Sequence, residues 1–366
     1  MSPAAVADVR AAAYRIPTDA PESDGTLAWD ATVLVVVEVE AGGLTGIGYT
    51  YAHQSAVGLV HDKLAGVVRS SDAFDVRATW RRMVDAARNL GAVGVTAMAI
   101  SAVDVALWDL KARLLDVSLA VALDAARETV PIYGSGGFTS YDDDQLADQL
   151  SGWVAAGIPR VKIKVGRDPD RDPERMRVAR KAIGDGTDLY VDANGAFTPR
   201  TAIEWSRTYR NEHGVRWFEE PVSSDDLAGL RLVRAQSPGG IDIAAGEYSW
   251  TPWASAALLE AEAVDCLQVD VTRCLGITGF LASAATAEAH QTDVSAHCAP
   301  QISAHACTAV RRLRHLEYFH DHVRIESLLF DGVLEPEPGG VLRPDRSRPG
   351  HGLTFKSADA ERFRVA

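Results

Sequence analysis

The sequence is poor in cysteine and has no long apolar run. Its 366 residues include four cysteines, none of them in a CxxC pair, so a disulfide framework is excluded and a reducing compartment is expected. No apolar run reaches the about 18 residues of a membrane span, and the start "MSPAAVADVR" lacks the charged and apolar regions of a secretory signal. These absences predict a cytoplasmic protein with no membrane partner.

Positive charge is also in deficit. The chain has 37 Lys and Arg against 50 Asp and Glu, a net charge of -13, which argues against a nucleic-acid partner. Such a protein can bind a small anion only where a local cation holds it. The glycine-rich "AGGLTGIG" at 41–48 joins two runs of strand character, so it predicts a hairpin and not a phosphate loop.

The first third of the chain has the pattern of an α+β unit. Residues 1–55 alternate as strands, most clearly in "ATVLVVVEVE", and the polar stretch 17–31 interrupts them. Residues 57–120 change to helical spacing, most clearly in "AISAVDVALWDLKARLL". We therefore expect an N-terminal α+β domain over residues 1–125.

From residue 130 onward, short apolar runs alternate with helical stretches. Eight strands separated by seven helices are typical of a parallel (β/α) barrel, here residues 126–320, and an open doubly wound sheet is the alternative. The tail 321–366, rich in proline and glycine, is expected to pack back onto the N-terminal domain. The eight runs are "VPIYGS" (130–135), "RVKIKV" (160–165), "DLYVDA" (188–193), "VRWFEE" (215–220), "IDIAAGE" (241–247), "VDCLQVD" (264–270), "TDVSAH" (292–297) and "RHLEYF" (314–319).

An ionisable residue recurs once per unit, near the carboxyl end of almost every run. Because barrel enzymes carry their chemistry at this end of the strands, the recurrence favours one shared site. Taken singly, each residue has a plain structural explanation: Lys162 and Lys164 could form a solvated strand face, and Asp192 could start a turn. The other members of the series are Glu219, Glu247, Asp270, His297 and Glu317.

Three of these residues suit a divalent cation. Asp192, Glu219 and Glu247 end neighbouring strands, and three carboxylates without histidine or cysteine are the donors that Mg²⁺ prefers, with Mn²⁺ as a possible substitute. Without a cation they would repel one another. The sequence therefore predicts a metal site at the barrel mouth.

The remaining residues suit acid and base chemistry on the two sides of that metal. Lys164 is the expected base, its pKa lowered by the ammonium of Lys162. Asp270 is expected to orient His297, and Glu317 to hold or protonate a substrate oxygen. Such a set can remove the proton next to a carboxylate, which needs strong electrostatic stabilisation of the ene-diolate.

The motifs "KIK", "VDAN", "FEEP", "AAGE", "LQVD" and "SAHCAP" resemble, in order and spacing, those of the mandelate racemase subgroup of the enolase superfamily. The resemblance covers essentially the whole chain and implies a (β/α)7β modified TIM barrel, with an α+β capping domain completed by the tail. It implies one Mg²⁺ per subunit, held by Asp192, Glu219 and Glu247, with Lys164 and the Asp270–His297 pair on opposite faces of the substrate. It also implies that Lys162 and Asn194 touch the substrate, and that Glu220 is not a ligand.

Substrate choice in this family comes largely from capping loops. The candidates here are residues 17–31 with Trp29 and residues 48–57 with Tyr51 and His53. Polar side chains at the last two positions favour a polyhydroxy substrate.

Three functions remain open from the sequence. The first is a Mg²⁺-dependent dehydratase of an acid sugar, an aldonate or aldarate, forming a 2-keto-3-deoxy acid. The second is a racemase or epimerase of a 2-hydroxy acid, and the third, ranked last, is a noncatalytic metal-binding scaffold. A homo-oligomer is the default assembly.

Overall fold

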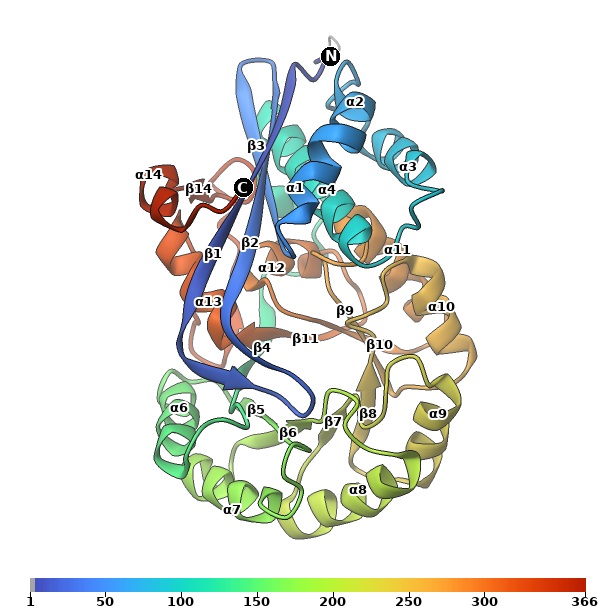
Figure 1. Cartoon of the computed structure of the whole chain (residues 1–366), viewed down its shortest axis with the longest axis vertical. Coiled ribbons are helices and arrows are strands. Elements are labelled where there is room, and N and C mark those ends of the chain that lie inside the picture. Colours follow the sequence, from blue (N-terminus) through green and yellow to red (C-terminus); the bar gives the residue numbers. More distant parts are fainter. Residues whose placement is uncertain (1–3) are drawn as a thin grey trace.

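The computed structural model describes residues 4–366, and these form an α+β cap that lies over one end of an eight-stranded barrel (Figure 1). The cap begins with an antiparallel meander of three strands, followed by short helices and one long helix. Its elements are β1 (Asp8–Ser23), β2 (Ala28–Ala41), β3 (Leu44–Tyr51), α1 (Ser55–Leu59), η1 (Val60–Leu64), α2 (Ala65–Val68), α3 (Val76–Ala86), α4 (Val95–Leu114) and α5 (Leu119–Ala122).

The barrel has the predicted eight parallel strands. Each pairs with the next along the chain, and the last pairs with the first, so the sheet is closed. The strands are β4 (Val130–Gly136), β5 (Arg160–Lys164), β6 (Asp188–Asp192), β7 (Trp217–Glu219), β8 (Asp242–Ala245), β9 (Cys266–Val269), β10 (Asp293–Ala296) and β11 (Leu313–Phe319). This closure confirms the barrel and excludes the open sheet.

Seven helices connect these strands and surround the barrel (Figure 1). Their starts follow from local sequence: Asp142, Thr198 and Thr251 each accept a hydrogen bond from a backbone N–H of the first turn, which satisfies a donor that has no partner within the helix. The helices are α6 (Asp143–Ala155), α7 (Asp172–Ile183), α8 (Pro199–His213), α9 (Leu227–Gln236), α10 (Pro252–Glu260), α11 (Gly276–Ala289) and α12 (Pro300–Thr308).

The long helix α4 is apolar on nearly every side because it is enclosed by the cap sheet and the barrel. Two glycines of β3 allow its close approach: a Cβ at Gly46 would lie 2.2 Å from the carbonyl oxygen of Ala106, and one at Gly48 would lie 2.1 Å from that of Ala102. On the barrel side, Asp104 accepts hydrogen bonds from the backbone N–H (2.9 Å) and hydroxyl (2.7 Å) of Thr278 in α11. Within residues 4–366, no helix combines the length and apolarity needed to cross a membrane.

The polar stretch 17–31 is not a loop, which corrects the expectation from sequence. β1 continues to Ser23 and β2 begins at Ala28, so this segment is the end of a long hairpin, with a register irregularity between Pro17 and Glu22. Figure 1 shows the hairpin reaching down from the cap to the barrel opening. The sequence did not predict strands here, because the segment is polar and lacks an alternating apolar pattern. Its strands pair with each other and dock on the barrel mouth, so they need no apolar face toward a core.

The hairpin turn fits closely against two barrel loops. A Cβ at Gly25 would lie 2.3 Å from the carbonyl oxygen of Ala193 and 2.8 Å from that of Val165, the residues that follow β6 and β5. Beside it, the hydroxyls of Ser23 and Thr139 are 2.6 Å apart. The hairpin is therefore positioned by direct contact with the ends of the strands that carry the candidate site.

The C-terminal tail contacts both parts of the molecule. One strand of the tail pairs antiparallel with the start of β4, while His351 bonds to Asp109 of α4 through its backbone N–H and to the carbonyl of Ile47 through its ring. The tail therefore ties the cap to the barrel. Its elements are α13 (His320–Leu329), β12 (Phe330–Asp331), β13 (Val341–Leu342), β14 (Thr354–Phe355), α14 (Ser357–Ala360) and η2 (Glu361–Phe363).

Candidate active site

The ionisable residues expected at the strand ends meet at the capped end of the barrel. Lys164, Asp192 and Glu219 are the last residues of β5, β6 and β7, and the parallel register pairs Lys164 with Asp192 and Asp192 with Glu219. Regular strand pairing alone thus places these three side by side. Glu247, Asp270 and His297 lie within two residues of the ends of β8, β9 and β10, Glu317 lies within β11, and all seven side chains are buried.

The three carboxylates predicted as metal ligands converge. One oxygen each from Asp192, Glu219 and Glu247 can be chosen so that all lie within 4.8 Å of one another. Hard oxygen donors at this spacing fit Mg²⁺. Glu220 does not belong to this group, and burial followed by the neighbouring Glu247 raises its pKa well above the usual range.

Neighbouring side chains donate hydrogen bonds to two of these carboxylates. Glu219 accepts hydrogen bonds from Trp217 Nε1 (2.9 Å) and Gln268 Nε2 (3.1 Å), and Glu247 Oε1 accepts one from the Arg273 guanidinium (2.9 Å). Such outer contacts fix the orientation of ligating carboxylates. The second oxygen of Glu247, Oε2, is buried without a hydrogen-bond partner among residues 4–366 and lies 3.2 Å from His297 Nε2. Its ion pair with His297 leaves room for a further ligand on this oxygen, as a metal ligand needs.

The two lysines differ in position. Lys164 Nζ lies 2.6 Å from Asp192 Oδ2 and lines the cavity beneath the cap. Lys162 is completely buried below it, with its Nζ 2.6 Å from Glu219, 2.8 Å from Glu317 and 5.4 Å from the centre of the Tyr133 ring. Lys162 does not line the cavity in this structure, and its expected contact with substrate stays a prediction.

The expected lowering of the Lys164 pKa is wrong for the structure without a metal. Burial and the ammonium of Lys162 lower the pKa of Lys164, but the carboxylates of Asp192, Glu219 and Glu247 together raise it by more. The charge of Lys164 in turn lowers the pKa of Asp192, against the effect of burial. The sequence argument counted the neighbouring lysine and overlooked the carboxylate that the strand register places opposite.

On the other side of the cavity, His297 is held by Asp270. The His297 Nδ1 and Asp270 Oδ2 atoms are 2.7 Å apart, and Asp270 Oδ1 accepts hydrogen bonds from the N–H and hydroxyl of Thr272, both at 2.7 Å. Burial lowers the pKa of His297, but Glu247, Glu317 and the bond to Asp270 raise it well above its usual range. The ring is therefore an imidazolium with Nε2–H directed at carboxylates.

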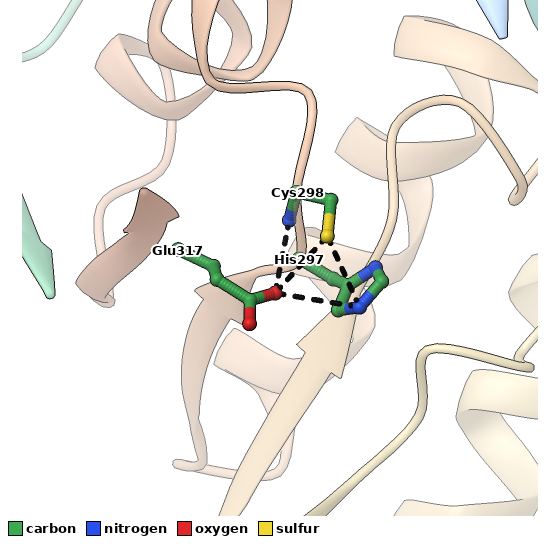
Figure 2. A group of neighbouring side chains, drawn as sticks. All are labelled: His297, Cys298 and Glu317. Atoms are coloured by element: carbon green, nitrogen blue, oxygen red, sulfur yellow. Dashed lines mark hydrogen bonds and ion pairs between the residues drawn. The ribbon is translucent and has the colours of Figure 1, made fainter. Parts of the chain in front are cut away.

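Figure 2 shows the group that surrounds His297 Nε2. Cys298 Sγ lies 3.3 Å from this nitrogen and 3.3 Å from Glu317 Oε2, which is itself 3.3 Å from the nitrogen. Glu317 also accepts a hydrogen bond from the hydroxyl of Ser135 at 2.6 Å. Burial raises the pKa of Glu317, but the charges of Lys162 and then His297 lower it by more, so its net shift is downward. This direction favours the ionised form of Glu317, and its expected role of holding or protonating a substrate oxygen stays a prediction.

The four residues predicted to contact substrate line one cavity together with Lys164, Glu247 and His297. Trp29, Tyr51, His53 and Asn194 all contribute to this cavity, which has a volume of about 570 Å³. Tyr51, however, does not offer its hydroxyl: the ring stacks on His322 with centroids 3.4 Å apart, and the hydroxyl bonds to the His322 carbonyl (3.4 Å) and Glu326 (3.3 Å). The preference for a polyhydroxy substrate expected from Tyr51 and His53 stays a prediction.

The sequence argument did not single out several residues of the cavity, among them Asp24, Arg273 and Cys298. Arg273 and Cys298 had a usable signal, because they follow Asp270 by three residues and His297 by one. Asp24 lies within the candidate segment 17–31, but only the folded hairpin shows that this residue lines the cavity.

Comparisons with known proteins agree with this geometry. The model of the mandelate racemase / muconate lactonizing enzyme N-terminal domain matches residues 9–123, and the enolase C-terminal domain-like model matches residues 145–360. A mandelate racemase/muconate lactonizing enzyme-like protein from Rubrobacter xylanophilus has 56% identity and a TM-score of 0.96, covering 98% of this chain and 99% of its own.

Two characterised relatives are similar over most of their length. The 3,6-anhydro-alpha-L-galactonate cycloisomerase of Streptomyces coelicolor is 32% identical, covering 95% of this chain and 96% of its own. The L-talarate/galactarate dehydratase of Salmonella typhimurium is 29% identical over 90% of this chain and 81% of its own. Its structure liganded with Mg and L-lyxarohydroxamate has a TM-score of 0.90 at 26% identity, covering 100% of this chain and 94% of that one. The chain therefore belongs to the mandelate racemase / muconate lactonizing enzyme family, and it is an enzyme of the enolase superfamily.

Proposed function

We propose that the protein is a Mg²⁺-dependent dehydratase of an acid sugar, producing a 2-keto-3-deoxy acid. The observation that carries the proposal is that Lys164 and His297 line one cavity with Glu247 of the carboxylate triad. They come from β5 and β10, which are separated by β4 and β11 in the closed sheet. A substrate between them meets a basic group on one side and a proton donor on the other.

The triad Asp192, Glu219 and Glu247 would hold the Mg²⁺. When bound, the ion supplies positive charge that offsets these carboxylates and withdraws electrons from the substrate carboxylate. The charge of Asp192 raises the pKa of Lys164, so once that charge is offset Lys164 would lose its proton more readily. In its neutral form it would take the proton from the carbon next to the substrate carboxylate. Lys162, in the layer below, balances the charge of Glu219 and Glu317, so the negative charge of the ene-diolate develops beside fixed cations.

His297 then completes the elimination. Its Nε2–H is the proton donor to the departing β-hydroxyl, which leaves as water, and Asp270 keeps the opposite nitrogen protonated and the ring oriented. The enol product tautomerises to the 2-keto-3-deoxy acid. Asn194, at a φ of 47° after Asp192 and lining the cavity, is proposed to contact the substrate.

A second candidate is a racemase or epimerase of a 2-hydroxy acid. The same two groups on opposite sides would remove and return the proton without a leaving group. The apolar and aromatic cap residues Leu27, Trp29 and Met98, which line the cavity, favour this alternative because they suit a substrate with fewer hydroxyls.

The test incubates the Mg²⁺-loaded protein with a panel of acid sugars and 2-hydroxy acids. We expect 2-keto-3-deoxy products, and loss of turnover on chelation that added Mg²⁺ restores. Exchange of the α-proton in D₂O with stereochemical inversion and no ketone would establish the racemase instead. Neither product nor exchange across the panel would overturn both functions and leave the noncatalytic scaffold.

We also propose a cytoplasmic homo-oligomer. All four cysteines are free and buried, which suits a reducing compartment, and large apolar side chains such as Leu90 and Trp253 are exposed on the isolated chain. Size-exclusion chromatography with light scattering measures the assembly.

A further inference from the structure

All strong cations of the cavity lie at its barrel end. Lys164 is the last residue of β5, while Arg273 and His297 come after the ends of β9 and β10. Arg273 is already engaged, with its guanidinium 2.9 Å from Glu247 and 3.4 Å from Asp270. These cationic groups lie around the metal site, where the carboxylate of a substrate is expected to bind.

The cap side of the same cavity carries a different set of side chains. Among residues 4–366, the cap contributes no lysine or arginine to the lining, and its wall is mostly apolar, with Leu27, Trp29, Val33, Val95 and Met98. His53 Nδ1 lies 3.2 Å from the backbone nitrogen of Ser55 and 3.0 Å from its hydroxyl. No lysine or arginine of the described part of the cap is therefore placed to receive a second anionic group.

One cap residue is instead an acid. Asp24 follows β1 in the hairpin turn, and its Oδ1 accepts hydrogen bonds from the backbone N–H groups of Thr26 and Leu27, both at 2.7 Å. Within the described chain Asp24 forms no ion pair. The neighbouring Arg167 bonds through Nε to the backbone carbonyl of Asp24 at 2.9 Å and does not line the cavity. The Asp24 carboxylate thus gives the cap wall a negative charge.

We propose that the cavity accepts acids with one carboxylate and an uncharged tail, and that Asp24 excludes diacids. The inference rests on the proposed function and narrows it from aldonates and aldarates to aldonates. The second carboxylate of an aldarate would lose water on entry, find no cation on the cap wall and lie near Asp24. Unpaired buried charge and like-charge contact both oppose binding.

The experiment compares matched acids that differ only at the far carbon. Binding of gluconate and glucarate, and of galactonate and galactarate, is measured by calorimetry on the Mg²⁺-loaded enzyme, with turnover of each acid measured in parallel. Asp24→Asn removes the charge but keeps Oδ1 for the turn. Asp30→Asn is the matched control, because Asp30 is an exposed carboxylate of the same hairpin, pairs with Arg15 and does not line the cavity.

We expect wild type to prefer the aldonate of a pair by about tenfold or more, and Asp24→Asn to reduce that preference while Asp30→Asn leaves it unchanged. The inference would be overturned if aldarates were turned over at the same rate as aldonates, or if Asp24→Asn did not alter the preference. Either result would leave the dehydratase standing. A preference in binding without turnover or exchange of any acid would overturn the dehydratase and leave the inference standing. Failure of both classes to bind would overturn both.

Discussion

The barrel end of the cavity and its cap wall are built on opposite principles. At the barrel end, charges are buried and packed in layers: Lys162 lies above the aromatic ring of Tyr133 and below Glu219 and Glu317, and each charge has a partner. On the cap wall, apolar side chains dominate and Asp24 stands without an ion pair among the described residues. This difference is what we expect if the barrel supplies the chemistry and the cap selects the substrate.

The two regions are also held by different forces. The barrel end is fixed by continuous strand pairing, so its side chains have little freedom. The cap hairpin is fixed by individual contacts to the barrel and the tail, including Arg324 to the carbonyl of Pro17 (2.7 Å) and the edge-on packing of Trp29 against Phe138 (5.6 Å between ring centres). Substitutions in the barrel end should therefore remove catalysis, and those in the hairpin should change affinity.

The largest effect is expected at the barrel end. Lys164→Ala and His297→Asn should each lower kcat by about 10³-fold, because each removes a group that exchanges a proton with substrate. The measurement is turnover together with α-proton exchange in D₂O. Lys63→Ala, at an exposed lysine of η1, is the control and should have wild-type activity.

Because Lys164 and His297 have buried ionic partners, their removal also threatens stability. Circular dichroism and thermal unfolding must show that each variant is folded before its kinetics are interpreted. A folded Lys164→Ala enzyme with full turnover would contradict the assignment of this lysine as the base.

A smaller effect is expected where the hairpin docks. Gly25→Ala places a Cβ within 2.3 Å of the Ala193 carbonyl oxygen, so the turn must move away from the barrel mouth. We expect KM to rise by about tenfold, with a smaller change in kcat. Gly152→Ala in α6, where a Cβ meets no atom within 4 Å, is the control. Equal KM values for both variants would show that the hairpin does not position substrate.

The smallest effect concerns pH and the stability of the hairpin. Burial, and then the charges of Asp321 and Asp19, raise the pKa of Glu22 from 4.5 to about 8. The hydrogen bond from Trp29 and the charge of Arg324 oppose this rise. The folded protein thus keeps a proton that the unfolded chain loses above pH 4.5. Stability from this group is therefore lost as pH rises from about 4.5 to about 8.

Glu22→Gln should remove that part of the decline, which amounts to a few kcal/mol. The measurement is the melting temperature of wild type and variant between pH 5 and 9. Glu128→Gln, at an exposed carboxylate, should follow wild type. Parallel curves for Glu22→Gln and wild type would show that Glu22 does not bind the proton.

The barrel and the members of its charged end could be predicted from the sequence because both follow from short-range periodicity. An ionisable residue lies near the carboxyl end of almost every strand, and parallel closure places all such ends at one rim. This argument located Asp192, Glu219 and Glu247 without any knowledge of side-chain contacts. It did not predict that residues 17–31 form the end of a hairpin, because their polar composition has no strand periodicity.

The sequence by itself thus determined the fold, the family and which residues converge, since these depend on pattern and spacing along the chain. Only the tertiary structure decided the charge states of Lys164 and Glu317, the turning of the Tyr51 hydroxyl away from the cavity, and the arrival of Asp24 at the barrel mouth. The reason is physical: a pKa and a hydrogen bond depend on the groups within a few ångströms in space, and in this protein those groups come from distant parts of the chain.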